Sequence, residues 1–268
     1  MALRSLFLTL AILCSVNAVS QTALLDKDRS LPCLDRQFLL MGHLTRDSSA
    51  TVVGTPELLE DAVAVLNEWY APICVSFQLA RVDTIDNFQY TRPANLNELE
   101  QLWAHHHEPY RINIYIVSSL NNISGECTFA PAEGVLQSQR EGVLIQANCL
   151  QQDARWLVHG FGHYCGLLHT NTDPGAELVD GSNCATTGDL ICDTPADPFE
   201  PGSLTYTNED YLDEDLCRFI FPLQDPNGHY YQPQTGNLMS QYPAHCWCGL
   251  TYDQYARMAR VLEEAGLW

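Results

Sequence analysis

Hydrophobic and polar positions divide the chain into an early part with regular periodicity and a later part with little. Apolar side chains that alternate or cluster in short runs predict β-strands at residues 37–45, 74–82, 111–117 and 142–147. Apolar side chains at helical spacing predict helices that begin at Thr55–Pro56 and at Asn95, and a last helix over residues 252–265. A further helix follows the strand at 142–147 directly.

Residues 170–235 have a different composition, rich in Gly, Pro, Asp, Asn and Thr and poor in periodic apolar runs. A stretch of this length without regular elements needs an anchor other than hydrophobic packing. Disulfides and bound ions are the physical candidates.

The N-terminus has the pattern of a secretory signal peptide. Arg4 precedes an apolar run at residues 6–13, and the small residues Ala18 and Ser20 follow it. We therefore expect residues 1–20 to be removed, residues 21–37 to form a short N-terminal segment, and the protein to be secreted. The apolar run is too short to cross a bilayer, and no later stretch approaches the ~20 apolar residues that a span needs.

The net charge limits which partners the protein can bind, and the cysteine count indicates an oxidising compartment. Removing Arg4 leaves 12 basic against 33 acidic residues, a net charge of 12 − 33 = −21. Such a surface repels phosphate backbones and anionic lipids, which argues against nucleic-acid and membrane partners. Ten cysteines remain after the signal peptide, and an even number in an exported chain predicts several disulfides of undetermined pairing.

Three histidines have the spacing of a metal site. His159 and His163 are four residues apart, so on a helix both rings leave the same face. Gly166 permits a sharp turn of the backbone, which brings His169 round as a third nitrogen ligand. Three imidazoles leave a fourth position for water, which is typical of a catalytic zinc site.

The pattern H-x-x-x-H-x-x-G-x-x-H resembles the metzincin zinc motif, and its surroundings resemble the pappalysin-like branch of secreted metalloendopeptidases. The run Gly188 to Pro195 (GDLICDTP) resembles that branch's G-D-x-x-x-D-T-P signature. Asn237-Leu238-Met239-Ser240 resembles its Met-turn, and Cys246 with the run LTYDQYARM at 250–258 resembles its closing cysteine and terminal helix. The motifs occur in the family's order from about residue 142 to the C-terminus.

The resemblance implies an α+β fold over residues 38–268. An upper subdomain (38–166) would hold a twisted mixed β-sheet with long helices, and a lower subdomain (167–268) would be irregular, disulfide-bearing and closed by the C-terminal helix. It implies that His159, His163 and His169 bind zinc, supported by Gly166, and that Met239 is the Met-turn residue. It also implies a Cys217–Cys246 disulfide.

The resemblance further implies that a peptide or protein binds in extended form along an edge strand, for which residues 111–117 are our candidate. Some relatives hold calcium in the irregular loops, so Ca²⁺ at the Asp-rich stretch 173–193 is a second metal hypothesis, although we favour a solvated loop there.

Two positions depart from the family. Gly160 stands where the glutamate that moves protons between zinc-bound water and the leaving amine is expected, and glycine offers neither acid nor base. Gln241 stands where a tyrosine is expected two residues after Met239, with Tyr242 one position later. Gln241 retains an amide donor and Tyr242 is close enough in sequence to substitute, so this second loss is partial.

The sequence therefore predicts a secreted zinc metalloendopeptidase-family protein with slow or absent peptide hydrolysis. The alternative is a non-catalytic relative, a pseudoprotease that binds peptides or a partner protein in the old cleft.

Overall fold

A computed structural model describes residues 29–131, 133–137 and 142–267. The predicted signal peptide lies outside the described residues. The chain divides into two compact units. We call residues 31–167 with 255–267 the sheet unit and Leu168–Gln254 the irregular unit.

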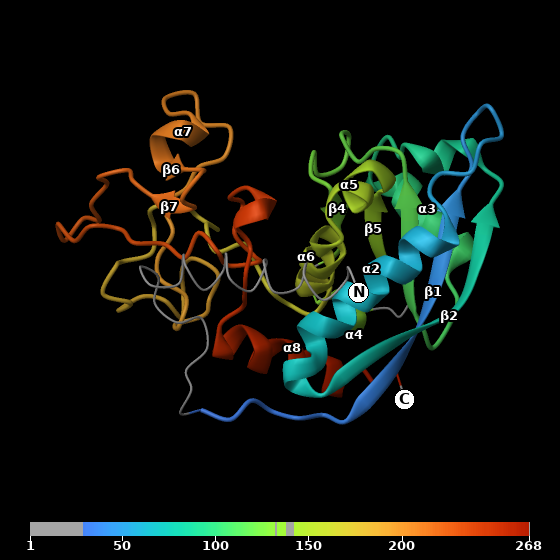
Figure 1. Ribbon diagram of the computed structural model, residues 1–268, viewed down its shortest axis with the longest axis horizontal. Coiled ribbons are helices and arrows are strands. Elements are labelled where there is room, and N and C mark those ends of the chain that lie inside the picture. Colours follow the sequence, from blue (N-terminus) through green and yellow to red (C-terminus); the bar gives the residue numbers. More distant parts are fainter. Residues whose placement is uncertain (1–28, 132, 138–141, 268) are drawn as a thin grey trace, which may run out of the picture. The chain divides into compact units, whose positions relative to one another are not determined.

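A five-stranded sheet forms the centre of the sheet unit (Figure 1). Its strands, in spatial order, are β2 (Val75–Ile85), β1 (Arg36–Thr45), β3 (Ile112–Val117), β5 (Gly142–Gln146) and β4 (Thr128–Phe129). Four strands run parallel, and β4 alone is antiparallel, paired with β5. The predicted twisted mixed sheet is therefore confirmed.

The strand predicted to lie at the edge does not lie there. β3 pairs with β1 on one side and with β5 on the other, so residues 111–117 were the wrong candidate for an edge. All six residues of β3 are buried. Alternation and apolar content identify a strand but not its neighbours, because pairing partners are distant in sequence. The sheet order places β4 at one edge and β2 at the other.

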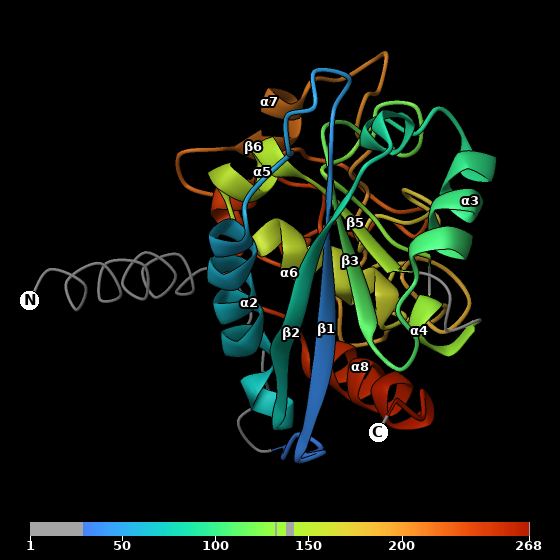
Figure 2. The same ribbon diagram turned by 90° about the vertical axis from the view of Figure 1, so that its right-hand side faces the viewer.

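Helices cover both faces of the sheet (Figure 2). The helix α2 (Pro56–Tyr70) begins as predicted, with the side chain of Thr55 accepting from Leu58 N. On the opposite face, α3 (Leu96–His106) is capped by Asn95, which accepts from Glu98 N. The remaining short elements are η1 (Ala71–Ile73), η2 (Phe88–Thr91), α4 (Gly134–Gln137) and α5 (Ala147–Gln152). The caps supply partners for backbone N–H groups that the first helical turn leaves unpaired.

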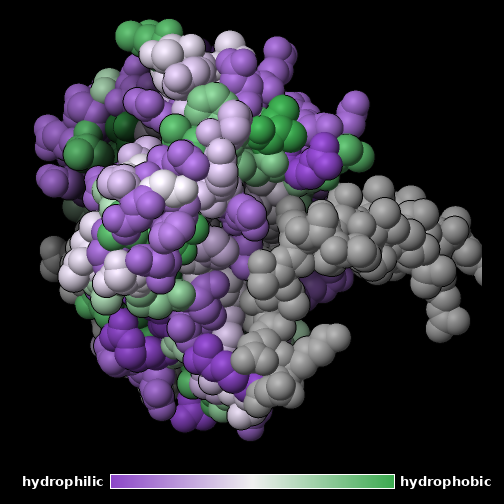
Figure 3. Space-filling view, turned by 90° about the vertical axis from the view of Figure 1, so that its left-hand side faces the viewer, coloured by the Kyte–Doolittle hydropathy of each residue, from purple (hydrophilic) through white to green (hydrophobic). Residues whose placement is uncertain are grey.

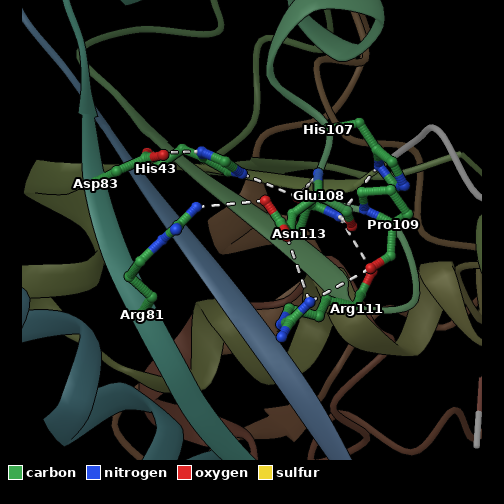
Figure 4. Close-up of polar contacts among 8 residues, drawn as sticks. All are labelled: His43, Arg81, Asp83, His107, Glu108, Pro109, Arg111 and Asn113. Carbon is green, nitrogen blue, oxygen red and sulfur yellow. Dashed lines mark hydrogen bonds and ion pairs between the residues drawn. The ribbon is translucent and has the colours of Figure 1, made fainter.

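A buried polar cluster around Asn113 ties β3 to its neighbours (Figure 4). Asn113 Oδ1 accepts from Glu108 N at 2.9 Å and lies 2.9 Å from His43 Nε2. Asn113 Nδ2 donates to the carbonyls of Glu108 and Arg111, both at 3.0 Å. The other ring nitrogen of His43 lies 2.8 Å from Asp83 Oδ1. One amide thus links β1, β3 and the loop before β3, which a core of apolar side chains would not specify.

The irregular unit contains little regular structure. Its elements are α7 (Asn208–Tyr211), β6 (Leu212–Asp213), β7 (Arg218–Phe219) and η3 (Ala244–Cys246). Disulfides join Cys184 to Cys192 and Cys217 to Cys246, the latter being the pair implied by the resemblance. The last helix, α8 (Tyr252–Glu264), begins in this unit, but its residues from Tyr255 onward group with the sheet unit.

Polar side chains dominate the face drawn in Figure 3, with hydrophobic residues in separate groups. Among the described residues, no helix has the length and apolar composition needed to cross a bilayer.

Candidate metal centre

The first two histidines of the motif project from one helix. α6 (Arg155–Tyr164) carries both His159 and His163, and their Nε2 atoms lie 3.1 Å apart. His159 is buried, at 1% exposed, and its ring packs edge-on to Trp156. The four-residue spacing thus brings the two nitrogens together, as the helical period requires.

The second ring nitrogen of His163 fixes its tautomer. Nδ1 lies 2.9 Å from the carbonyl oxygen of Leu167, which only accepts, so Nδ1 carries the hydrogen and Nε2 keeps a lone pair. Burial lowers the pKa of His163, against the opposing effect of the bond to Leu167. The neutral ring therefore presents its lone pair toward His159, and a backbone carbonyl is a common orienting partner of a metal-ligating histidine.

Gly166 ends α6 and turns the chain. Its φ is +87°, a region that glycine occupies without strain. Gly166 N donates to His163 O at 2.8 Å, and Leu167 N donates to Gly162 O at 2.9 Å, which closes the helix in a Schellman-type cap. His169 follows three residues later. One ring nitrogen from each of His159, His163 and His169 lies within 4.8 Å of the others.

These three side chains fit zinc. Two nitrogens bound tetrahedrally to Zn²⁺ at about 2.0–2.1 Å lie about 3.3 Å apart, close to the 3.1 Å between the Nε2 atoms here. The third imidazole belongs to the same group, and neutral nitrogen donors suit this ion. A second group among the described residues, Cys217, His245 and Cys246, has both of its sulfur atoms joined in a disulfide and so fits an ion less well.

The predicted Met-turn is a tight turn in the irregular unit. Ser240 N and Ser240 Oγ both donate to Asn237 O, and Asn237 Oδ1 accepts from Met239 N at 2.9 Å. Met239 is completely buried, and its carbonyl accepts from Thr170 N at 3.1 Å. Since Thr170 directly follows His169, this turn holds the backbone beside the third histidine.

Gly160, Gln241 and Tyr242 each have definite surroundings. Gly160 is buried within α6 and carries no side chain. Gln241 Oε1 accepts from Asn171 Nδ2 at 2.8 Å. Tyr242 is buried, stacks on Phe199 and donates from its hydroxyl to Asp197 Oδ1 at 3.0 Å. These contacts occupy Gln241 and Tyr242, and their predicted roles at the metal stay predictions.

The carboxylates proposed for calcium serve as protein acceptors. Asp189 Oδ1 accepts from Ile191 N and Thr194 Oγ1, and Asp193 Oδ2 accepts from Asp253 N. Calcium at residues 173–193 stays a prediction.

One residue of the site escaped the sequence analysis, the carbonyl of Leu167 that orients His163. Its only signal was its place four residues after His163, at the end of a helix whose last carbonyls are unpaired.

No family model matches the chain. A protein of Verticillium alfalfae named extracellular metalloprotease is 29% identical over 168 residues, covering 58% of this chain and 55% of the relative. Extracellular metalloproteases of Colletotrichum graminicola and Neurospora crassa are 27% and 28% identical over similar lengths. The chain spans about half the length of these relatives.

The fold matches a solved structure over most of its length. A structure of mirolysin in complex with compound 9 superposes with a TM-score of 0.57, covering 86% of this chain and 91% of that one, at 16% identity. The fold of this chain is therefore similar to that of mirolysin. The sequence relatives all carry the name extracellular metalloprotease.

Proposed function

We propose that this chain is a secreted, zinc-binding member of the metalloprotease family in which peptide hydrolysis is slow or absent. One observation carries the proposal: the two Nε2 atoms of α6 converge at 3.1 Å, with His169 in the same group, while the residue after His159 is a buried glycine. The pappalysin-like subtype is part of the proposal, supported by the motifs of the sequence.

The roles of the residues follow from their contacts. His159, His163 and His169 would hold the ion, and Leu167 O keeps the His163 lone pair turned toward it. Bound zinc would lower the pKa of a water molecule to about 7. Gly160 has no group that takes a proton or returns it to the leaving amine. Loss of a general acid–base typically costs about 10²–10⁴ in rate.

A second candidate function is peptide binding without cleavage, and the sheet topology favours it. β4 ends the sheet order and pairs antiparallel with β5. Among the described strands, its other side has no partner. An extended peptide can add to such an edge through main-chain hydrogen bonds. β4 therefore replaces residues 111–117 as our candidate for the peptide-binding strand.

The test is hydrolysis of casein and of a mixed fluorogenic peptide pool by the zinc-loaded protein, with and without a chelator. We expect no turnover above that of a His163→Ala control, together with one zinc per chain. Chelator-sensitive cleavage at rates usual for proteases would refute the proposal of lost activity and leave the metal site intact.

Peptide binding has its own readout. Casein fragments that are not cleaved, titrated calorimetrically, should bind the intact protein. They should bind more weakly when Thr128→Pro removes the backbone N–H of β4 that points away from β5. Equal binding by this variant would exclude β4 as the docking strand.

A further inference from the structure

We propose that Gly160 is a packing glycine at the contact between α6 and the sheet, so that Val143 and Thr128 close the position where the family places its glutamate. The inference deepens the proposed function, on which it rests for the meaning of position 160. The packing contact itself is independent of whether the protein binds zinc.

The space for a side chain at position 160 is already filled. A Cβ built on Gly160 would lie 2.9 Å from Cγ1 of Val143, 3.2 Å from Cβ of Thr128 and 3.4 Å from its Cγ2. Carbon atoms in contact prefer about 3.5–4.0 Å. Even the smallest side chain therefore requires Val143 to move, and a glutamate must pass through the same gap.

Neither neighbour moves freely. Val143 lies on β5 between β3 and β4 and is completely buried. Its β-branched side chain has few χ1 rotamers, so it does not swing aside as a long flexible chain would. Thr128 is 2% exposed and lies on β4, in register with Ile145 of β5. A close-packed interior transmits such an overlap as strain rather than absorbing it.

Thr128 presents carbon atoms to position 160. The nearest are its Cβ and Cγ2, so the contact with the helix is apolar. Among the described residues, the hydroxyl Oγ1 of Thr128 is buried without a hydrogen-bond partner, which is costly and leaves this side chain little reason to hold another rotamer open.

Two explanations of Gly160 predict opposite changes in stability for the variant Gly160→Ala. If the glycine merely lacks a catalytic group, Gly160→Ala should stabilise the protein, since alanine favours helix. If the glycine is required by packing, the same variant should be destabilised. Restoring glutamate at 160 alone would then fail to rebuild the site, because Val143 must be replaced as well.

The test is a double-mutant cycle on the chelator-treated protein, with the thermal unfolding midpoint as readout. Gly160→Ala should lower Tm by roughly 2–10 °C. In the Val143→Ala background that loss should shrink by at least half, because the obstructing Cγ1 is gone. A rise in Tm for Gly160→Ala in the otherwise unchanged protein would overturn the proposal.

A matched control uses Val117→Ala. Val117 is also completely buried in the sheet, but it belongs to the cluster with Tyr115 and Leu144, which packs against α3. Removing the same two methyl groups there should leave the cost of Gly160→Ala unchanged, since distant sites add. If Val117→Ala reduces the Tm loss of Gly160→Ala as much as Val143→Ala does, the reduction is not specific to Val143, and the proposed contact is contradicted.

Activity separates this inference from the proposed function. Gly160→Glu with Val143→Ala should cleave casein at least tenfold faster than Gly160→Glu alone, and zinc content should be equal in both. Should neither variant fold, the alanine cycle still decides. If the unchanged protein cleaves casein, the proposed function is wrong, but the double-mutant cycle remains a valid test of packing. If the effects of Gly160→Ala and Val143→Ala on Tm simply add, only the packing inference is wrong.

Discussion

The interactions that stabilise the sheet unit differ from those that stabilise the irregular unit. In the sheet unit, every residue of the parallel strands β3 and β5 is buried. Among the described residues, each unit holds two disulfides. In the irregular unit the strands have two residues each, and order comes from a small cluster that includes Phe199, Tyr211 and Tyr242 and from buried carboxylates and amides that accept backbone hydrogen bonds.

This comparison bears on the metal segment. α6 packs on the sheet, so the first two histidines have a rigid support. The backbone after His169 is held by turn contacts such as Thr170 N to Met239 O.

The largest predicted effect concerns the disulfide Cys217–Cys246. Replacing both cysteines with alanine removes a crosslink between residues 29 apart, worth roughly 3–4 kcal/mol of unfolding free energy. Cys33–Cys74, 41 apart in the sheet unit, has a similar entropic value. Urea unfolding measures both losses. Limited proteolysis should cut only residues 168–254 in the first variant, and cleavage inside the sheet would contradict the contrast.

The next effect is at the polar cluster of the sheet unit. Asn113→Ala leaves the Glu108 N–H and a ring nitrogen of His43 without their acceptor, which we expect to cost about 2–4 kcal/mol. Asn113→Asp keeps an acceptor but sets a buried carboxylate oxygen against the carbonyls of Glu108 and Arg111, so its loss should be at least as large. Chemical denaturation measures both losses. A loss below about 1 kcal/mol in Asn113→Ala would show that this cluster does not tie the strands together.

A pH-dependent effect is predicted in the irregular unit. Burial, then Asp189 and Asp197, raise the pKa of Glu177 to about 8. The folded state holds this proton more tightly than the unfolded chain, so unfolding free energy falls as pH rises from about 4.5 to 8. Glu177→Gln should therefore stabilise the protein at pH 8, by about 1–3 kcal/mol, and leave it nearly unchanged at pH 4. Urea midpoints across this range test it.

The exposed Glu214 of the same unit provides the control. Glu214→Gln should leave the pH profile of stability unchanged. If the unfolding free energy of Glu177→Gln depends on pH as that of the unchanged protein does, the Glu177 carboxylate does not cause the pH dependence.

The smallest stability effect is at the turn between the two parts of the metal segment. Gly166→Ala forces alanine into a φ of +87° and brings its Cβ within 3.0 Å of Glu133 Cγ, at a cost of about 1–2 kcal/mol. Zinc affinity should fall with it. Gly125→Ala, at a φ of +72° with open space, is the control and should leave zinc affinity unchanged.

The sequence predicted the positions of the helices and longer strands better than it predicted which strands pair. Thr55 and Asn95 were predicted as helix starts because capping is a local contact, and both side chains accept the expected N–H groups. The centre of the sheet was misjudged because nothing within residues 111–117 encodes which strands flank them. The short strands β4, β6 and β7 were missed, since two residues give no periodic signal.

The same limit applies to the site. Histidine spacing encodes the convergence of His159 and His163, because one helix supplies both. The closure of position 160 depends on Val143 and Thr128, which precede it by 17 and 32 positions in the printed sequence and meet it only in the folded sheet.

The most direct test is the zinc content of the purified protein after dialysis against a weak chelator. We predict one zinc per chain, falling to well below one in His163→Ala. Substoichiometric zinc in the unchanged protein, or full zinc in the variant, would contradict the three-histidine centre.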